Sequence, residues 1–148
     1  MNQKTFAALG LPSEQLANLE SLEYHSMTPI QAQSLPHGLQ GRDVIAQAKT
    51  GSGKTAAFGL GLVTRVDVGR FRVQSLVLCP SRELDDQVEL DLRRLCRYHL
   101  NFKILVLCGG EPFGPQVDSL RHGAQIVVGT PGRIDEHLRK GTLKLQHV

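Results

Sequence analysis

The 148-residue sequence contains no tryptophan, few cysteines and no long apolar run. None of its apolar stretches approaches the roughly 20 residues that a membrane-spanning helix needs, so no membrane partner is expected. The N-terminus lacks the basic region, apolar stretch and cleavage site of a secretory signal. These absences predict a cytoplasmic protein.

The three cysteines are Cys79, Cys96 and Cys108, and no two of them form a C-x-x-C pair. An odd, widely spaced set fits neither a disulfide framework nor a zinc site. We expect small buried hydrophobic side chains in a reducing compartment. The histidines also lack metal-ligand spacing, and we expect them at the surface. They are His25, His37, His99, His122, His137 and His147.

The net charge is +3, from 17 Lys and Arg against 14 Asp and Glu. This balance alone predicts nothing about partners, because a uniformly solvated surface explains it equally well. The clustering of Arg93, Arg94 and Arg97 gives weak support for an anionic partner. A hydrophobic content of 41% is typical of a soluble globular chain, and the length suits one domain.

The most informative stretch is 43–55, which reads DVIAQAKTGSGKT. The apolar run 44–46 predicts a strand, Gly51-Ser52-Gly53 a tight turn, and the Ala/Leu-rich residues after Thr55 a helix. Strand, glycine-rich loop and helix are the context of a phosphate-binding loop, in which backbone N–H groups and the helix dipole converge on an anion. The blander alternative is a glycine-rich turn before a helix with a surface lysine.

This loop predicts a nucleotide site. Lys54 would reach the β- and γ-phosphates, and the Thr55 hydroxyl would ligate Mg²⁺. Ala48 stands where the strict pattern has glycine. The loop residues expected at the nucleotide are Ala48, Thr50, Gly51, Ser52, Gly53, Lys54 and Thr55.

Apolar runs and helical patterns alternate along the chain, which predicts an α/β fold with a mainly parallel sheet and helices on both faces. The turns after the strands should meet at one edge of that sheet, where ligands bind in open α/β folds. Those turns read AKTGSGKT, PSREL, GG and TPGR. The expected strands are 44–47, 75–79, 103–108 and 125–129, and the expected helices include 13–22, 82–98, 115–120, one from Thr28-Pro29 and one from Thr130-Pro131.

Together these landmarks resemble the N-terminal RecA-like domain of the DEAD-box RNA helicases, a P-loop NTPase fold. The matching segments are Tyr24 with Thr28-Pro29-Ile30-Gln31 (Q motif), Ala48–Thr55 (motif I), Pro80–Leu84 (motif Ia), Gly109-Gly110, and Thr130–Arg133 (motif Ib). The wording AFGLGL and LCGGEPFGPQ is most similar to a bacterial type that acts on large-subunit ribosomal RNA in ribosome assembly.

The resemblance implies ATP and Mg²⁺ as cofactors and RNA as partner. Gln31 would read the adenine edge, with Thr28 beside it, and Tyr24 would pack on the base unless it is a half-buried core aromatic. Phe6 is either the upstream aromatic of the Q motif or a core residue. The residues implied at the RNA backbone are Pro80, Ser81, Arg82, Gly109, Gly110, Thr130, Pro131, Gly132 and Arg133. Helix-end ion pairs are the alternative for the two arginines.

Three positions depart from the family pattern: Glu23 replaces a glycine, Ser81 a threonine and Asp85 an alanine. An Asp85 side chain that faced the groove would repel RNA phosphate. The chain ends at Val148, before the family's acidic box and second RecA-like domain. Residues 1–148 are therefore expected to form a partial domain with little ATPase activity and poor stability, because the strand 44–47 would be an exposed apolar edge.

Two other functions stay open at this point. One is a stand-alone module that holds nucleotide or RNA without turnover. The other is a P-loop NTPase unrelated to RNA.

Overall fold

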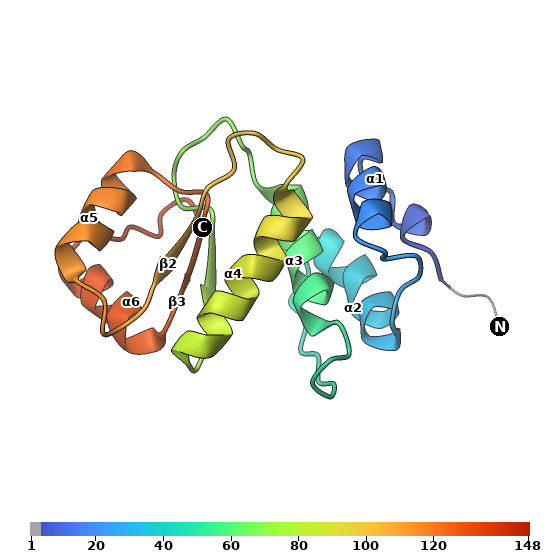
Figure 1. The fold of residues 1–148 in the computed structure, drawn as a ribbon, viewed down its shortest axis with the longest axis horizontal. Coiled ribbons are helices and arrows are strands. Elements are labelled where there is room, and N and C mark those ends of the chain that lie inside the picture. Colours follow the sequence, from blue (N-terminus) through green and yellow to red (C-terminus); the bar gives the residue numbers. More distant parts are fainter. Residues whose placement is uncertain (1–3) are drawn as a thin grey trace. The chain divides into compact units, whose positions relative to one another are not determined.

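The computed structural model describes residues 4–148, which divide into two compact units (Figure 1). Unit 1 comprises the chain up to Arg65 together with Asp91–Tyr98, and unit 2 comprises Val66–Leu90 and His99–Val148. Helix α4 (Arg82–Cys96) contributes its first half to unit 2 and its second half to unit 1. No helix of the described residues has the length and apolarity to cross a membrane.

Unit 1 consists of helices and the loop that precedes α3. Its other helices are η1 (Phe6–Leu9), α1 (Ser13–Ser21), α2 (Pro29–Leu39) and α3 (Lys54–Arg65). The start of α2 follows from the sequence, because Thr28 is the N-cap and Pro29 occupies the first position, where a missing N–H costs nothing. Helix α3 packs closely on the second half of α4, since a Cβ on Gly59 would lie 2.8 Å from a methyl group of Leu95.

Two buried side-chain amides of α1 donate hydrogen bonds to the last backbone carbonyls of α4. The last carbonyls of a helix have no partner within it. Gln15 Nε2 donates to the Leu95 carbonyl at 2.9 Å, and Asn18 Nδ2 donates to the Arg94 carbonyl at 3.0 Å. Arg97 Nε in turn donates to Asn18 Oδ1 at 2.8 Å. Unit 1 is thus fastened by polar contacts between segments about 80 residues apart in sequence.

Unit 2 is a three-stranded parallel sheet with the order β1-β3-β2. The strands are β1 (Ser75–Leu78), β2 (Ile104–Leu107) and β3 (Ile126–Gly129), and the helices are α5 (Phe113–His122) and α6 (Pro131–Arg139). In Figure 1, α5 and α6 lie on one side of the sheet and the first half of α4 lies on the other. The central strand β3 is buried along its whole length. This arrangement confirms the predicted α/β class with a parallel sheet.

The three strands end level with one another. Gly129 at the end of β3 pairs with Leu78 of β1 and with Leu107 of β2. The segments that follow these residues therefore emerge at the same edge of the sheet, as the sequence predicted for PSREL, GG and TPGR. The fourth predicted turn, the glycine-rich loop, belongs to unit 1.

The predicted strand 44–47 is wrong. Residues 42–49 have no regular secondary structure, Val44 is exposed, and the Ile45 side chain is completely exposed. A strand is stable only when its backbone N–H and C=O groups pair with a neighbour. No strand among residues 4–148 pairs with this segment, and its apolar side chains are exposed to solvent. The apolar side chains are exposed, but they do not form the strand edge that the sequence predicted.

Candidate functional site

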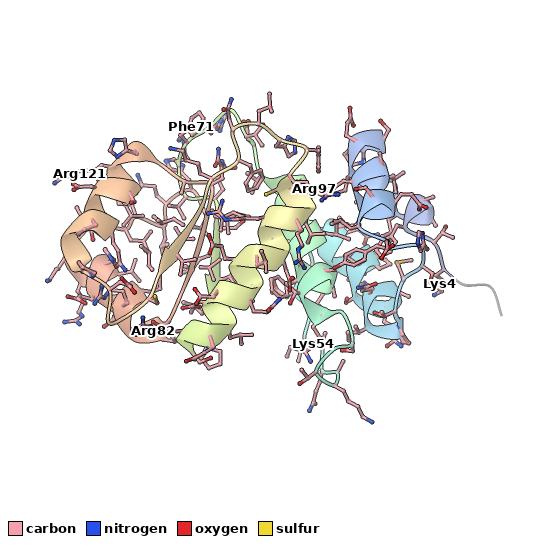
Figure 2. All side chains as sticks on the ribbon, in the orientation of Figure 1. Lys4, Lys54, Phe71, Arg82, Arg97 and Arg121 are labelled. Carbon is pink, nitrogen blue, oxygen red and sulfur yellow. The ribbon has the colours of Figure 1, made fainter. Side chains whose placement is uncertain are left out.

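The glycine-rich loop has the backbone that phosphate binding requires. Gly51 and Gly53 have φ values of 80° and 85°, in the left-handed region that residues with a Cβ rarely adopt. Helix α3 begins directly afterwards at Lys54, so the unpaired N–H groups of its first turn and its positive dipole end lie at the loop. Figure 2 shows Lys54 at this end of α3. The loop is thus arranged to receive an anion.

The Lys54 side chain folds back over the loop. Its Nζ donates to the carbonyls of Ala48, at 2.5 Å, and Lys49, at 2.9 Å. Ser52 Oγ donates to the same Lys49 carbonyl at 2.5 Å. Because an ammonium group has three donors, one remains for a further acceptor. The Lys54 ammonium group is therefore held against the loop, at the place where the sequence predicts a phosphate.

Gln31 joins the Q motif to this loop. Its Nε2 donates to the Gly53 carbonyl at 3.2 Å, and its Oε1 accepts from the Thr28 backbone N–H at 3.0 Å. The Thr28 hydroxyl accepts from the Gln31 N–H, so the two residues form a capping box at the start of α2. Each of these partners has a fixed donor or acceptor role, which sets the orientation of the amide. One amide hydrogen and one oxygen lone pair stay available to a ligand.

No side chain larger than hydrogen fits at Gly53. A Cβ there would collide with Gln31 Nε2 and would lie 3.3 Å from Thr28 Oγ1, in addition to the positive φ. The glycine therefore serves both the turn and the close approach of the glutamine. The structure brings together three of the residues that are predicted to bind the nucleotide, Thr28, Gln31 and Gly53.

Tyr24 follows a left-handed residue at the end of α1. Glu23 has φ 65°, its N–H donates to the Glu20 carbonyl, and the Tyr24 N–H donates to the Leu19 carbonyl at 2.9 Å. This is the Schellman arrangement, in which the left-handed position is usually glycine. Glu23 thus adopts a left-handed backbone conformation that usually requires glycine. The Tyr24 ring is 37% exposed and stacks against buried Phe6, with ring centroids 6.4 Å apart.

Thr55 is the one residue predicted to ligate a metal ion. Thr55 is partly buried in the first turn of α3. Within residues 4–148 there is no group of three or more His, Cys, Asp or Glu side chains that could hold a metal ion. Ligation of Mg²⁺ by the Thr55 hydroxyl therefore stays a prediction, and residues 4–148 provide no acidic cluster that would complete the coordination.

The residues predicted to bind RNA lie at the carboxyl edge of the unit 2 sheet. Ser81 caps α4, because its Oγ accepts from the Leu84 N–H at 3.3 Å, so the serine retains the capping role of a threonine. Most of the set is exposed, whereas Gly109, Thr130 and Arg133 are partly buried. The exposed members are Pro80, Ser81, Arg82, Gly110, Pro131 and Gly132.

Arg82 and Arg133 meet at the turn after β2. Arg82 Nη2 lies 3.3 Å from Glu111 Oε1, and a Cβ on Gly110 would lie 2.6 Å from Arg82 Nη1. Arg133 Nη1 donates to the Glu111 carbonyl at 2.8 Å. Both arginines thus contact the same turn, one through its carboxylate and one through its backbone.

Arg133 is largely occupied by contacts within unit 2. Its side chain is only 13% exposed, its Nε lies 3.1 Å from Glu136 Oε2, and its Nη1 also donates to Gln116 Oε1 at 3.0 Å. The ion pair with Glu136 matches the helix-end alternative that the sequence left open. Arg133 is therefore better placed to hold the turn than to project into solvent.

The expectation that all six histidines lie at the surface is wrong for His137. This side chain is fully buried, stacks on Phe113 with centroids 4.2 Å apart, and its Nε2 lies 2.8 Å from Gln116 Oε1. Burial lowers the pKa of His137, and the positive charges of Arg133 and Lys140 lower it further against the opposing effect of Glu136. A neutral ring that donates from Nε2 satisfies the contact with Gln116 Oε1. The Thr142 hydroxyl lies 2.7 Å from Nδ1 and 3.1 Å from the His137 carbonyl, and its single hydrogen can serve only one of these two acceptors.

Asp85 does not face the RNA edge, because it is completely buried. Neither carboxyl oxygen has a hydrogen-bond partner with normal geometry among the described residues. Burial raises the pKa of the Asp85 carboxyl, an effect that the neighbouring Cys79 thiol opposes and the Asp86 charge reinforces. Burial, together with Asp85, raises the pKa of Cys79 to about 11. All three cysteines are free and buried, as predicted.

A cleft of about 510 Å³ lies elsewhere in unit 2 and contains none of the predicted site residues. Val73, Leu120 and Leu143 contribute its apolar lining, and Arg72 and Arg121 contribute charge. The candidate sites are instead backbone-lined edges, which bind phosphates without a deep hollow.

Sequence reasoning did not find Glu111, Gln116 or His137. The pattern held one usable signal, because His137 lies three residues after buried Ile134, on the same face of α6. Nothing in the sequence indicates that Glu111 pairs with Arg82, 29 residues earlier.

Comparison with known proteins gives a consistent result. Residues 28–148 match the DEAD/DEAH box helicase family. The chain is 61% identical over 135 residues to ATP-dependent RNA helicase DbpA of Escherichia coli, which covers 91% of this chain and 30% of DbpA. It is 46% identical over 144 residues to DEAD-box ATP-dependent RNA helicase CshA of Bacillus cereus, which covers 97% of this chain and 27% of CshA.

Solved structures agree with these sequence matches. A DEAD box protein from Methanococcus jannaschii has a TM-score of 0.91 and 37% identity, over 97% of this chain and 39% of that one. Dbp5 of S. cerevisiae bound to RNA and ADP BeF3 has a TM-score of 0.86 and 30% identity, over 98% of this chain and 36% of Dbp5. The present chain thus spans between a quarter and two-fifths of each of these relatives. It belongs to the DEAD/DEAH box helicase family.

Proposed function

We propose that this chain is the ATP- and RNA-binding front part of an ATP-dependent RNA helicase. The observation that carries the proposal is the hydrogen bond from Gln31 to the Gly53 carbonyl, which ties a residue suited to reading a purine to a phosphate-binding loop. Membership of the family and the similarity to DbpA and CshA, both described as ATP-dependent RNA helicases, support it.

The nucleotide would bind through groups with separate tasks. The free amide hydrogen and lone pair of Gln31 suit the adenine edge, which presents an acceptor and a donor side by side. The amides at the N-terminus of α3 and the Lys54 ammonium suit the phosphates. The Thr55 hydroxyl suits Mg²⁺, which keeps several waters and takes few protein ligands. Bound Mg²⁺ would neutralise charge that develops on the phosphates during phosphoryl transfer.

RNA would bind along the carboxyl edge of the unit 2 sheet. The predicted contacts are cations, a hydroxyl and exposed backbone, without side chains positioned for base edges, so they suit a sugar-phosphate backbone of any sequence. The segments AFGLGL and LCGGEPFGPQ, which resemble a bacterial type that acts on ribosomal RNA, favour ribosomal RNA as the target of the whole helicase. On its own, this chain is expected to bind nucleotide and RNA without hydrolysing ATP at a useful rate, because residues 4–148 contain no acidic cluster that could complete a metal site.

Nucleotide binding tests the first half of the proposal. A fluorescent ATP analogue should bind the chain in the presence of Mg²⁺ and be displaced by ATP better than by GTP. Lys54→Ala should abolish binding, since it removes the mobile phosphate ligand, whereas Lys49→Ala removes a neighbouring exposed lysine and should leave affinity unchanged. Unchanged affinity in Lys54→Ala would disprove the site.

Discrimination between bases tests Gln31. Gln31→Glu retains an oxygen for the Thr28 N–H but replaces the donor to Gly53 with an acceptor. The preference for ATP over GTP should disappear in this variant. An intact preference would show that another residue reads the base, whereas no preference in the parent chain would indicate a generic P-loop protein.

RNA binding tests the second half. A labelled single-stranded RNA should bind with an affinity that falls steeply with salt and differs little between sequences. A strong sequence preference would contradict backbone recognition. Nucleotide binding without any RNA binding would favour a binding module of another kind.

A further inference from the structure

Arg82, which is predicted to hold an RNA phosphate, is already paired with a carboxylate. We propose that Glu111 is a phosphate surrogate: it occupies the Arg82 guanidinium in the free protein, and RNA must displace it. Glu111 would thereby set how tightly and with what salt dependence this edge binds RNA. The inference rests on the RNA-binding function proposed above.

The geometry places three groups at one point. Arg82 Nη2 and Glu111 Oε1 are 3.3 Å apart, and the Arg82 guanidinium also lies against Gly110, where an added Cβ would come within 2.6 Å of Nη1. Gly110 has φ 85°, so the turn presents bare backbone beneath the arginine. The carboxylate therefore sits among the groups that are predicted to contact RNA.

Hydrogen bonds from Arg133 and Gln116 hold the backbone on either side of Gly109-Gly110, including that of Glu111. Arg133 Nη1 donates to the Glu111 carbonyl at 2.8 Å and to Gln116 Oε1 at 3.0 Å. Gln116 Nε2 donates to the Cys108 carbonyl at 3.1 Å, on the other side of the two glycines. These three bonds, of which the one to the Glu111 carbonyl is exposed and the other two are partly or fully buried, fix both ends of the turn. The Glu111 carboxylate is thus kept near Arg82 even though its own side chain is exposed.

A carboxylate and a phosphate compete for the same donors. Guanidinium groups bind both through parallel N–H···O bonds, and one such fork cannot serve two anions fully. The Arg82 and Glu111 side chains are 53% and 57% exposed, and an exposed ion pair of this kind contributes little stability. RNA can therefore displace Glu111 at a small cost, and removal of the carboxylate should not unfold unit 2.

The test compares RNA affinity in Glu111→Gln and in the parent chain. A fluorescein-labelled decauridine is titrated with the 148-residue chain, and anisotropy is recorded at several salt concentrations. Glu111→Gln should bind about 2- to 5-fold tighter at low salt, the range that a released surface ion pair allows. The log–log salt slope should become steeper by up to about 0.7, because one more cation would neutralise phosphate.

Asp118→Asn is the matched control. It makes the same change in net charge on α5, where Asp118 pairs with Arg121 at 3.7 Å. This variant should bind like the parent, and an equal gain in it would reduce the effect to overall charge and overturn the proposal. In an Arg82→Gln background, Glu111→Gln should no longer change affinity, since the surrogate would have nothing to occupy.

Other outcomes are equally decisive. Equal or weaker binding by Glu111→Gln, with the parent binding normally, would mean that Glu111 orients Arg82 for RNA and does not compete with it. That result would overturn this inference and leave the proposed function intact. Failure of every variant, the parent included, to bind the decauridine would overturn both.

Discussion

Replacement of Asp85 by alanine should stabilise unit 2. The Asp85 side chain is completely buried, and its carboxyl oxygens have no hydrogen-bond partner among the described residues other than the neighbouring Cys79 thiol, which is a weak donor. An unsatisfied buried polar group costs about 1–3 kcal/mol, and more when it is charged. Asp85 recovers part of this cost by lying in the first turn of α4, where a negative charge gains about 0.3–1 kcal/mol from the helix dipole. The expected net gain is about 1–2 kcal/mol.

The gain should depend on pH in a defined direction. Burial raises the pKa of Asp85 in the folded chain, so between the unfolded value of 3.8 and the raised folded value the native state binds the proton more readily. Parent stability attributable to this group therefore increases as the pH falls through that window. The advantage of Asp85→Ala should be largest near pH 7 and should shrink towards pH 4.

Urea unfolding followed by circular dichroism measures the difference. With a slope of about 1.5 kcal/mol per molar urea, the midpoint should rise by about 1 M at pH 7. Asp86→Ala is the matched control, because Asp86 is the exposed neighbour on the same turn and its removal should change the midpoint little. A lower midpoint for Asp85→Ala, or an advantage that grows with acid, would refute the reasoning and mean that the carboxyl has a stabilising partner.

Three further outcomes follow from single residues. Glu23→Gly should stabilise unit 1 by about 0.5–1 kcal/mol in urea unfolding, because left-handed strain of about 1–2 kcal/mol is relieved at some entropic cost; a loss of stability would contradict the strain. The lowered pKa of His137 means that unit 2 should lose stability as the pH falls below about 6.5, and His137→Gln should weaken that dependence; an unchanged profile would exclude the histidine. A thiol reagent should label the native chain slowly, since Cys79 and Cys96 are buried with pKa values raised to about 11; rapid labelling of either would contradict their burial.

The sequence correctly predicted those helix starts and strands that depend on residues close to one another in the chain. Thr28 and Pro29 predicted the start of α2, and the apolar run 125–129 predicted β3. Both predictions succeeded because helix capping and a fully buried strand depend on residues close in sequence. Helix α5 is longer than predicted, since it starts at Phe113 before Gly114 and Pro115. These residues usually break helices, but in a first turn the missing proline N–H has no partner to lose.

The sequence did not predict features that depend on partners far away in the chain. The apolar run 44–46 has strand composition, yet pairing decides whether a strand forms, and composition carries no information on pairing. The burial of His137 depends on Gln116 and Phe113 of another helix. The proximity of Gln31 to Gly53 was expected only from the family resemblance, because nothing in the spacing of 22 residues requires it.

Within residues 4–148, strand β1 (Ser75–Leu78) pairs with β3 on one flank and with no strand on the other. Leu78 at its end is 55% exposed. A polypeptide segment of this molecule or of another copy could pair its backbone with that flank of β1 and extend the sheet by one strand. The same flank is where solubility should first be lost as concentration rises, and a charged residue in place of Leu78 should delay that loss.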